Sequence, residues 1–221
     1  NAYSVSAGNY LSWMDLSGNN NHASQETSTN QAYYNVADRH LVSFDGSSDY
    51  YTISKDMNGS TSFRVFMAVE VNSDVSSTQS FLMKGDSSGG NFPYLINSQS
   101  SGVGVAMSSS STYGSPSILA SSNDNHVILE FDIQASGSNS LAAIYLNGIN
   151  QTLSSSTLSS ALINYNDDDA LGWLLGADYD STSINDFFNG EMYEIMYFDG
   201  TVTDENAYKI RYYLSQKWGL T

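Results

Sequence analysis

The sequence predicts an all-β protein in which two antiparallel sheets pack as a sandwich, with one helix at the C-terminal end. Three observations favour this fold class. Short segments alternate apolar and polar residues at the period of a strand. The composition, with 17 Gly, 16 Tyr and only 2 Pro in 221 residues, suits strands joined by tight turns. One stretch near the C-terminus has the start signal and the apolar spacing of a helix.

The C-terminal third shows the expected elements most clearly. It reads as a short strand over 174–177, a polar loop over 178–186 and a second, alternating strand over 191–198. After a turn at Asp199 and Gly200, Thr203 opens a helix with Glu205 in its first turn, and this helix runs to Trp218. We therefore expect a sandwich closed by a terminal helix.

The middle of the chain supplies further strands. The segment FRVFMAVEV at 63–71 is apolar on both faces, which predicts a central strand. A strand is expected at 81–85, another at 103–107 within a Ser-rich frame, and a pair at 126–134 and 143–148. The whole of 1–221 is long enough for one large domain, and nothing in it marks a second.

The C-terminal third resembles the closing segment of laminin-G-like jelly-roll domains in the concanavalin A-like lectin/glucanase superfamily. The shorter patterns around Trp13, Phe44 and His126 resemble the same domains. The matching positions near the C-terminus are Gly190, Glu191, Glu194, Tyr213, Leu214, Lys217, Trp218 and Gly219. The resemblance implies a jelly-roll β-sandwich. Function stays open, because the superfamily includes lectins, adhesion modules, glycanases, lyases and spacers.

The charge balance excludes some partners. With 7 basic and 23 acidic residues the formal net charge is −16, which repels nucleic-acid backbones and anionic membranes. The same charge attracts divalent cations. Neither nucleic-acid binding nor membrane insertion is expected.

The chain contains no Cys, which excludes disulfides and thiolate metal sites. It has no apolar run long enough to span a bilayer and begins at Asn1 without a signal sequence. We expect a domain excised from a longer secreted or cell-surface protein, with other domains of that chain as neighbours.

Asp45 and Asp49 flank Gly46 in a segment that resembles a hairpin of the laminin-G-like domains. Their oxygens could surround one hard cation such as Ca²⁺. The alternative is an Asp-Gly hairpin that needs no metal.

The strand at 126–134 raises the question of catalysis. Glu130, Asp132 and Gln134 project from one face of a strand, an arrangement that resembles the Glu, Asp and Glu of the family-16 endoglucanase signature, except that Gln134 stands in the third position. A retaining glycosidase needs two carboxyl groups about 5 to 5.5 Å apart, and Gln134 can neither donate nor accept the proton. The resemblance to laminin-G-like domains assigns Glu130 to a structural strand, so no catalytic residue is expected.

Two acidic loops with aromatic neighbours, at 164–169 and 178–186, are the remaining candidates for a site. If they meet at one end of the sandwich, they could hold Ca²⁺ and present it to sugar hydroxyls, while aromatic rings stack on the sugar face. A solvated acidic surface is the alternative. The candidate sugar-binding residues are Tyr94, Tyr165, Asn166, Trp173, Tyr179 and Asn185, and the candidate Ca²⁺ ligands are Asp45, Asp49, Asp167, Asp168, Asp178 and Asp180.

These features together predict a lectin-like module that binds a carbohydrate or polysaccharide without cleaving it, with Ca²⁺, as part of an extracellular adhesin or polysaccharide-acting protein. Two alternatives stay open. One is a glycan hydrolase or lyase of the same fold, and the other is a protein-binding or spacer domain of a surface protein.

Overall fold

The computed structural model describes most of the chain. The described residues are 3–6, 8–35, 41–53, 62–72, 78–84, 94–98, 102–107, 110–113, 126–158, 172–180 and 183–220.

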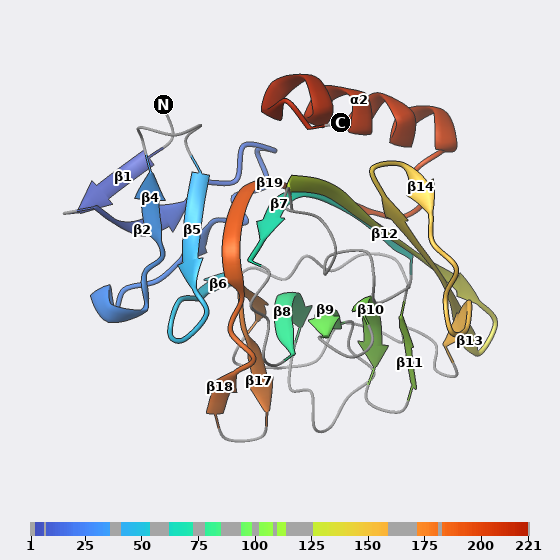
Figure 1. The fold of residues 1–221 in the computed structure, drawn as a ribbon, viewed down its shortest axis with the longest axis horizontal. Coiled ribbons are helices and arrows are strands. Elements are labelled where there is room, and N and C mark those ends of the chain that lie inside the picture. The colour runs from blue at the N-terminus through green and yellow to red at the C-terminus, as the bar shows by residue number, and fades with distance from the viewer. Residues whose placement is uncertain are drawn as a thin grey trace.

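Two antiparallel layers form a β-sandwich, as the sequence predicts (Figure 1). The first layer runs, neighbour by neighbour, through β4 (Tyr33–Asn35), β5 (Leu41–Asp45), β19 (Asn189–Asp199), β7 (Phe63–Val71), β12 (His126–Ser136) and β13 (Asn139–Leu146), with β14 (Ile149–Asn150) and β15 (Thr157–Leu158) beside β13. The second layer runs through β3 (Ala23–Ser24), β6 (Tyr51–Ile53), β16 (Trp173–Leu175), β8 (Gln79–Lys84), β9 (Tyr94–Ser98), β10 (Gly102–Met107) and β11 (Ser110–Tyr113).

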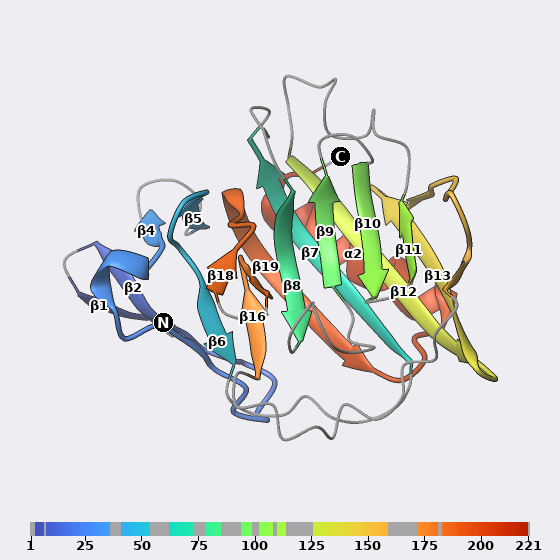
Figure 2. The same ribbon diagram turned by 90° about the horizontal axis from the view of Figure 1, so that it is seen from below.

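The two layers are joined at the N-terminal side. β2 (Asn9–Trp13) pairs with β1 (Tyr3–Ser6), with β3 of the second layer and with β4 of the first. A 3₁₀ turn, η1 (Ser28–Asn30), follows β3. A separate two-stranded hairpin consists of β17 (Asp178–Asp180) and β18 (Ser183–Asn185). The helix α2 (Asp204–Trp218) lies across the outer face of the first layer, and Figure 2 shows it behind the strands of the second layer.

β7 is the central strand that its apolar sequence predicts. It pairs with β12 on one side and with β19 on the other. Val65, Met67 and Val69 point into the core between the layers, whereas Phe66 and Ala68 point outward and are covered by α2. Burial on both faces explains why this strand has no polar alternation.

The helix begins and ends where the sequence predicts. The Thr203 side chain caps the N-terminus by accepting a hydrogen bond from the Asn206 backbone N–H over 3.3 Å. Gly219 ends the helix at φ 67°, in the left-handed region that suits glycine, and its N–H donates to the Ser215 carbonyl. Ala207 and Leu214 are the helix residues that the contact with the sheet buries.

Glu194 of β19 explains much of the C-terminal sequence pattern. Its carboxylate accepts hydrogen bonds from the Trp218 indole N–H over 2.8 Å and from the Lys217 ammonium over 2.9 Å. The Tyr213 hydroxyl donates to the same carboxylate over 3.3 Å. Four residues on which the resemblance rests therefore form one contact between the last strand and the helix.

Two sequence-based predictions were wrong in detail. The segments around Asp45 and Asp49 do not form a hairpin, because β5 belongs to the first layer and β6 to the second, so the turn between them is a corner that joins the layers. The segment 178–186 is not a loop, because β17 and β18 pair within it. The strands β6, β17 and β18 have three residues each, and hydrophobic alternation cannot identify a strand that short.

The helices within the described part of the chain include none with the length and apolar content needed to cross a bilayer.

Candidate functional site

The corner between β5 and β6 is a tightly bonded carboxylate turn. The Asp45 carboxylate accepts hydrogen bonds from the backbone N–H groups of Ser47 and Ser48, each over 2.8 Å, and from that of Asp49 over 3.2 Å. It also accepts from the hydroxyls of Ser47 and Ser48, over 2.6 and 3.0 Å. The Asp49 carboxylate accepts from the Asp45 backbone N–H over 2.9 Å. The two acids thus bind each other's backbone.

The environment shifts the pKa values of these two acids in opposite directions. Burial tends to raise the pKa of Asp45, but the hydrogen bonds from Ser47, Ser48 and Asp49 outweigh it and lower that pKa to about 2. Burial, followed by the negative charge of Asp45, raises the pKa of Asp49 to about 6. At neutral pH both groups carry a charge, and the charge of Asp49 destabilises the folded state because it is buried beside that of Asp45.

The corner packs against the segment that leads into β19. A side chain in place of Gly46, which has φ 72°, would meet the Asn189 Cβ at 2.7 Å, so glycine allows this close approach. Beside it, the ring centroids of Tyr50 and Phe187 lie 6.5 Å apart. The corner is thereby fixed to the same segment, 186–189, that follows the β17–β18 hairpin.

The β17–β18 hairpin carries the second group of predicted residues. Asp178 pairs with Asn185 across it, and Tyr179 pairs with Ile184. It lies against β8, where the Tyr179 backbone N–H contacts the Met83 sulfur at 3.2 Å. Tyr179 and Asn185 are both partly exposed, as a sugar contact requires, whereas Asp178 is 4% exposed.

The predicted calcium ligands that the structure describes do not form one group. Hydrogen bonds within the corner account for the carboxylates of Asp45 and Asp49 without a cation. Asp180 is described only through its backbone in β17. Asp167 and Asp168 lie outside the described residues. Within the described residues, no three His, Asp or Glu side chains are close enough together to hold a metal ion.

The other predicted sugar-binding residues are Trp173, Tyr94, Tyr165 and Asn166, and the part of the chain that the structure describes does not show them as one group. Trp173 is 1% exposed in the core, where its ring meets Tyr197 edge to face at 5.4 Å. It therefore cannot offer a ring face to a sugar, and its assignment as a platform was wrong. Tyr94 begins β9, but its side chain is not described. Tyr165 and Asn166 lie outside the described residues.

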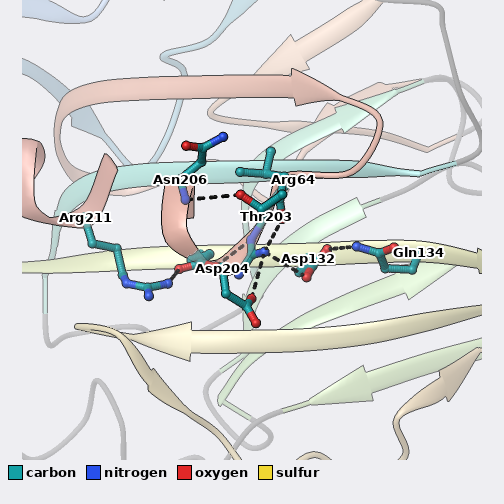
Figure 3. Close-up of polar contacts among 9 residues, drawn as sticks. Arg64, Asp132, Gln134, Thr203, Asp204, Asn206 and Arg211 are labelled. Atoms are coloured by element: carbon teal, nitrogen blue, oxygen red, sulfur yellow. Dashed lines mark hydrogen bonds and ion pairs between the residues drawn. The ribbon is translucent and has the colours of Figure 1, made fainter. Parts of the chain in front are cut away.

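A buried ion network occupies the strand that resembles the glucanase signature (Figure 3). Glu130 is fully buried between β12 and α2. One of its oxygens accepts from the Arg64 guanidinium over 2.6 Å, and the other accepts from the Arg211 guanidinium over 2.6 Å. Burial tends to lower the pKa of the Arg64 guanidinium, but Glu130 outweighs it and raises that pKa above its ordinary value.

The rest of this network fixes the start of the helix. Arg64 also donates to the Val202 carbonyl over 2.9 Å and lies 3.3 Å from the Asp132 carboxylate. Figure 3 shows Asp132 and Gln134 side by side along β12, where the Gln134 amide donates to Asp132 over 2.7 Å. Glu130 is fully buried and has two guanidinium partners, so these contacts join β12 to β7 and to α2.

The exposed aromatic side chains of α2 were not predicted as site residues. Tyr208, Tyr212 and Tyr213 are 63%, 57% and 43% exposed. Their spacing in a helix, with Tyr208 and Tyr212 four residues apart, was the signal that places two of them on one face.

Comparison with known proteins adds a likeness of fold. No protein-family model and no curated protein matches the sequence. Solved structures do match. The CBM40 of a Ruminococcus gnavus IT-sialidase, bound to alpha2,3 sialyllactose, aligns with a TM-score of 0.57 at 13% identity, over 77% of this chain and 96% of that one.

Two enzymes are similar in the same way. The NanB sialidase of Streptococcus pneumoniae aligns with a TM-score of 0.55 at 16% identity, over 76% of this chain and 26% of that one. An arabinofuranosidase complexed with arabinofuranosyl-alpha-1,2-xylobiose aligns with a TM-score of 0.56 at 14% identity, over 95% of this chain and 51% of that one. The chain thus spans about a quarter of the NanB sialidase. The fold is the jelly-roll β-sandwich that these carbohydrate-acting proteins contain.

Proposed function

We propose that this chain is a non-catalytic carbohydrate-binding module of an extracellular protein. The observation that carries the proposal is the likeness to the sialidase CBM40, a module bound to sialyllactose, which the alignment covers almost completely. The chain also aligns with only part of each of the two enzymes, as a separable module would. These likenesses lie below 25% identity, so the choice of sugar depends on this chain's own residues.

The surface available for a glycan is polar, with scattered aromatic side chains. Tyr179 and Asn185 on the hairpin supply one partly exposed ring and one amide. Each hydroxyl contact replaces a contact with water, so one site should bind weakly, with a Kd of about 10⁻⁴ to 10⁻³ M. Repeated modules or a polymeric ligand would raise the effective affinity.

The finer parts of the proposal are dependence on Ca²⁺, an adhesin or polysaccharide-acting parent protein, and membership of the laminin-G-like group. The formal charge of −16 and the buried carboxylate of Asp178 on the hairpin support a cation near β17. Asp167 and Asp168, which lie outside the described residues, remain the other candidate ligands.

A glycan array tests the proposal, run once with Ca²⁺ and once with a chelator. Binding in both buffers supports a module that does not need Ca²⁺, and binding lost with the chelator supports the finer proposal. A melting curve in each buffer is the control, because removal of a structural ion would unfold the chain and mimic the second result.

The alternatives give different results in the same experiment. A hydrolase or lyase of this fold, which the likeness to the arabinofuranosidase keeps open, would shorten the glycans that it meets. A protein-binding or spacer domain would leave every spot of the array empty.

A further inference from the structure

A cavity lies between α2 and the edge of the first layer. Its volume is about 300 Å³. The helix lines it with Tyr208, Arg211, Tyr212 and Ser215, and the turn between β13 and β14 lines it with Asn147 and Gly148. This volume is at the lower end of the range for small-molecule sites, enough for one or two sugar units.

The helix side of the cavity carries two aromatic rings. The rings of Tyr208 and Tyr212 are stacked, with their planes 18° from parallel and their centroids 6.5 Å apart. The two side chains are among the most exposed large apolar groups of the described chain. Exposed tyrosines offer apolar ring surface together with hydroxyls, which suits the C–H face of a sugar and its flanking hydroxyls.

The turn between β13 and β14, on the opposite side of the cavity, is held in place. Asn147 and Gly148 form the turn with φ values of 49° and 80°. The Asn147 side-chain oxygen accepts from the Ile128 backbone N–H over 2.8 Å, which ties the turn to β12. A side chain at position 148 would meet the Arg211 Nε at 3.2 Å, so glycine lets Arg211 lie over the turn. Fixed walls lower the entropic cost of binding.

The charges around the cavity favour a neutral ligand. Arg211, which lines it, is paired with Glu130 at 2.6 Å. The network behind it sets the two guanidinium groups of Arg64 and Arg211 against three carboxylates, those of Glu130, Asp132 and Asp204. No positive charge is left over for an anionic sugar in this network, and the whole chain is acidic.

We infer that the cavity between α2 and the β13–β14 turn binds a neutral sugar, with the rings of Tyr208 and Tyr212 in contact with the sugar. The inference rests on the proposed carbohydrate binding and names a site and a ligand class for it. A sialylated glycan would bring its carboxylate to a network that already contains an excess of carboxylates, and should therefore bind less well than the same glycan without sialic acid.

Titration calorimetry with lactose, 3′-sialyllactose and arabinoxylan oligosaccharides tests the inference on three proteins. These are the wild type, the double variant Tyr208→Ala with Tyr212→Ala, and the control Tyr33→Ala, which removes an exposed tyrosine of β4. We expect the wild type to bind at least one neutral glycan, the double variant to lose at least tenfold in affinity, and the control to bind as the wild type does. Melting curves exclude unfolding.

The outcomes separate the two claims. No binding to any of these glycans by the wild type overturns this inference, and the glycan array then decides the proposed function separately. Full binding by the double variant, or tighter binding of 3′-sialyllactose than of lactose, overturns the inference alone. If the double variant fails to fold, amide chemical shifts of the wild type on titration decide instead: shifts at Asn147, Gly148 and Tyr212 support the site, and shifts confined to β17 and β18 contradict it.

Discussion

The backbone N–H of Asp45 donates to the Asp49 carboxylate over 2.9 Å, and the backbone N–H of Asp49 donates to the Asp45 carboxylate over 3.2 Å. This reciprocal pair closes the corner at which the chain passes from one layer of the sandwich to the other. The two carboxyl groups share one turn but not one environment, since Asp45 has many donors and Asp49 is buried beside a charge. The corner should therefore respond to pH.

The first prediction concerns stability and the raised pKa of Asp49. Because the folded pKa of about 6 exceeds an unfolded value of about 4, the folded state binds the proton more tightly. The contribution of this group is fully present below about pH 4 and is lost as pH rises to about 6, amounting to as much as about 3 kcal/mol. Asp49→Asn keeps an acceptor for the Asp45 N–H and removes the titration.

Urea unfolding of wild type and Asp49→Asn at pH 4 and pH 7.5 checks this. The difference in the free energy of unfolding, variant minus wild type, should be larger at pH 7.5 than at pH 4. Equal differences at the two pH values would contradict the raised pKa.

The second prediction concerns how the two acids interact. Asp45→Asn removes a negative charge beside Asp49, so the pKa of Asp49 should fall, yet it should stay above its ordinary value because burial is the larger cause of the shift. A carboxyl-carbon NMR titration measures it directly. An unchanged pKa would show that the two groups do not interact.

The third prediction concerns the buried ion network. Glu130→Gln leaves Arg64, which is 2% exposed, without the charge of its main partner, and should lower the free energy of unfolding by about 3 to 5 kcal/mol. Asp204→Asn is the matched control, since that carboxylate is 96% exposed and 3.7 Å from the same guanidinium, and it should change little. Similar losses in the two variants, measured by urea unfolding, would refute the assigned role of Glu130.

The fourth prediction concerns Gly190 at the start of β19. Its φ is 153°, and a Cβ there would lie 2.1 Å from the Glu70 carbonyl oxygen, which is part of the backbone and cannot turn aside. Gly190→Ala should therefore prevent folding or lower the melting temperature severely. Gly18→Ala is the control, because Gly18 also has a positive φ but a Cβ at that position would meet nothing within 4 Å, so only the backbone cost of about 1 to 2 kcal/mol applies. Equal losses of melting temperature in the two variants would show that the close approach is unimportant.

Sequence reasoning predicted the fold better than the site. Local signals identify the helix from Thr203 to Trp218 and the central strand over 63–71, because caps and apolar runs act over a few residues. The pairing of Arg64 with Glu130, 66 positions apart, has no local signal. Trp173 shows the same limit. A tryptophan between polar loops is equally consistent with a sugar-stacking ring and with a core residue, and only the packing of the folded chain shows that Trp173 is a core residue.

The most direct test of the central claim, that the chain binds carbohydrate without cleaving it, is to apply the folded wild type to a glycan array and then to examine each occupied spot by mass spectrometry. The account predicts occupied spots whose glycans keep their full mass. Shortened glycans would contradict the non-catalytic role, and an array without any occupied spot would contradict carbohydrate binding itself.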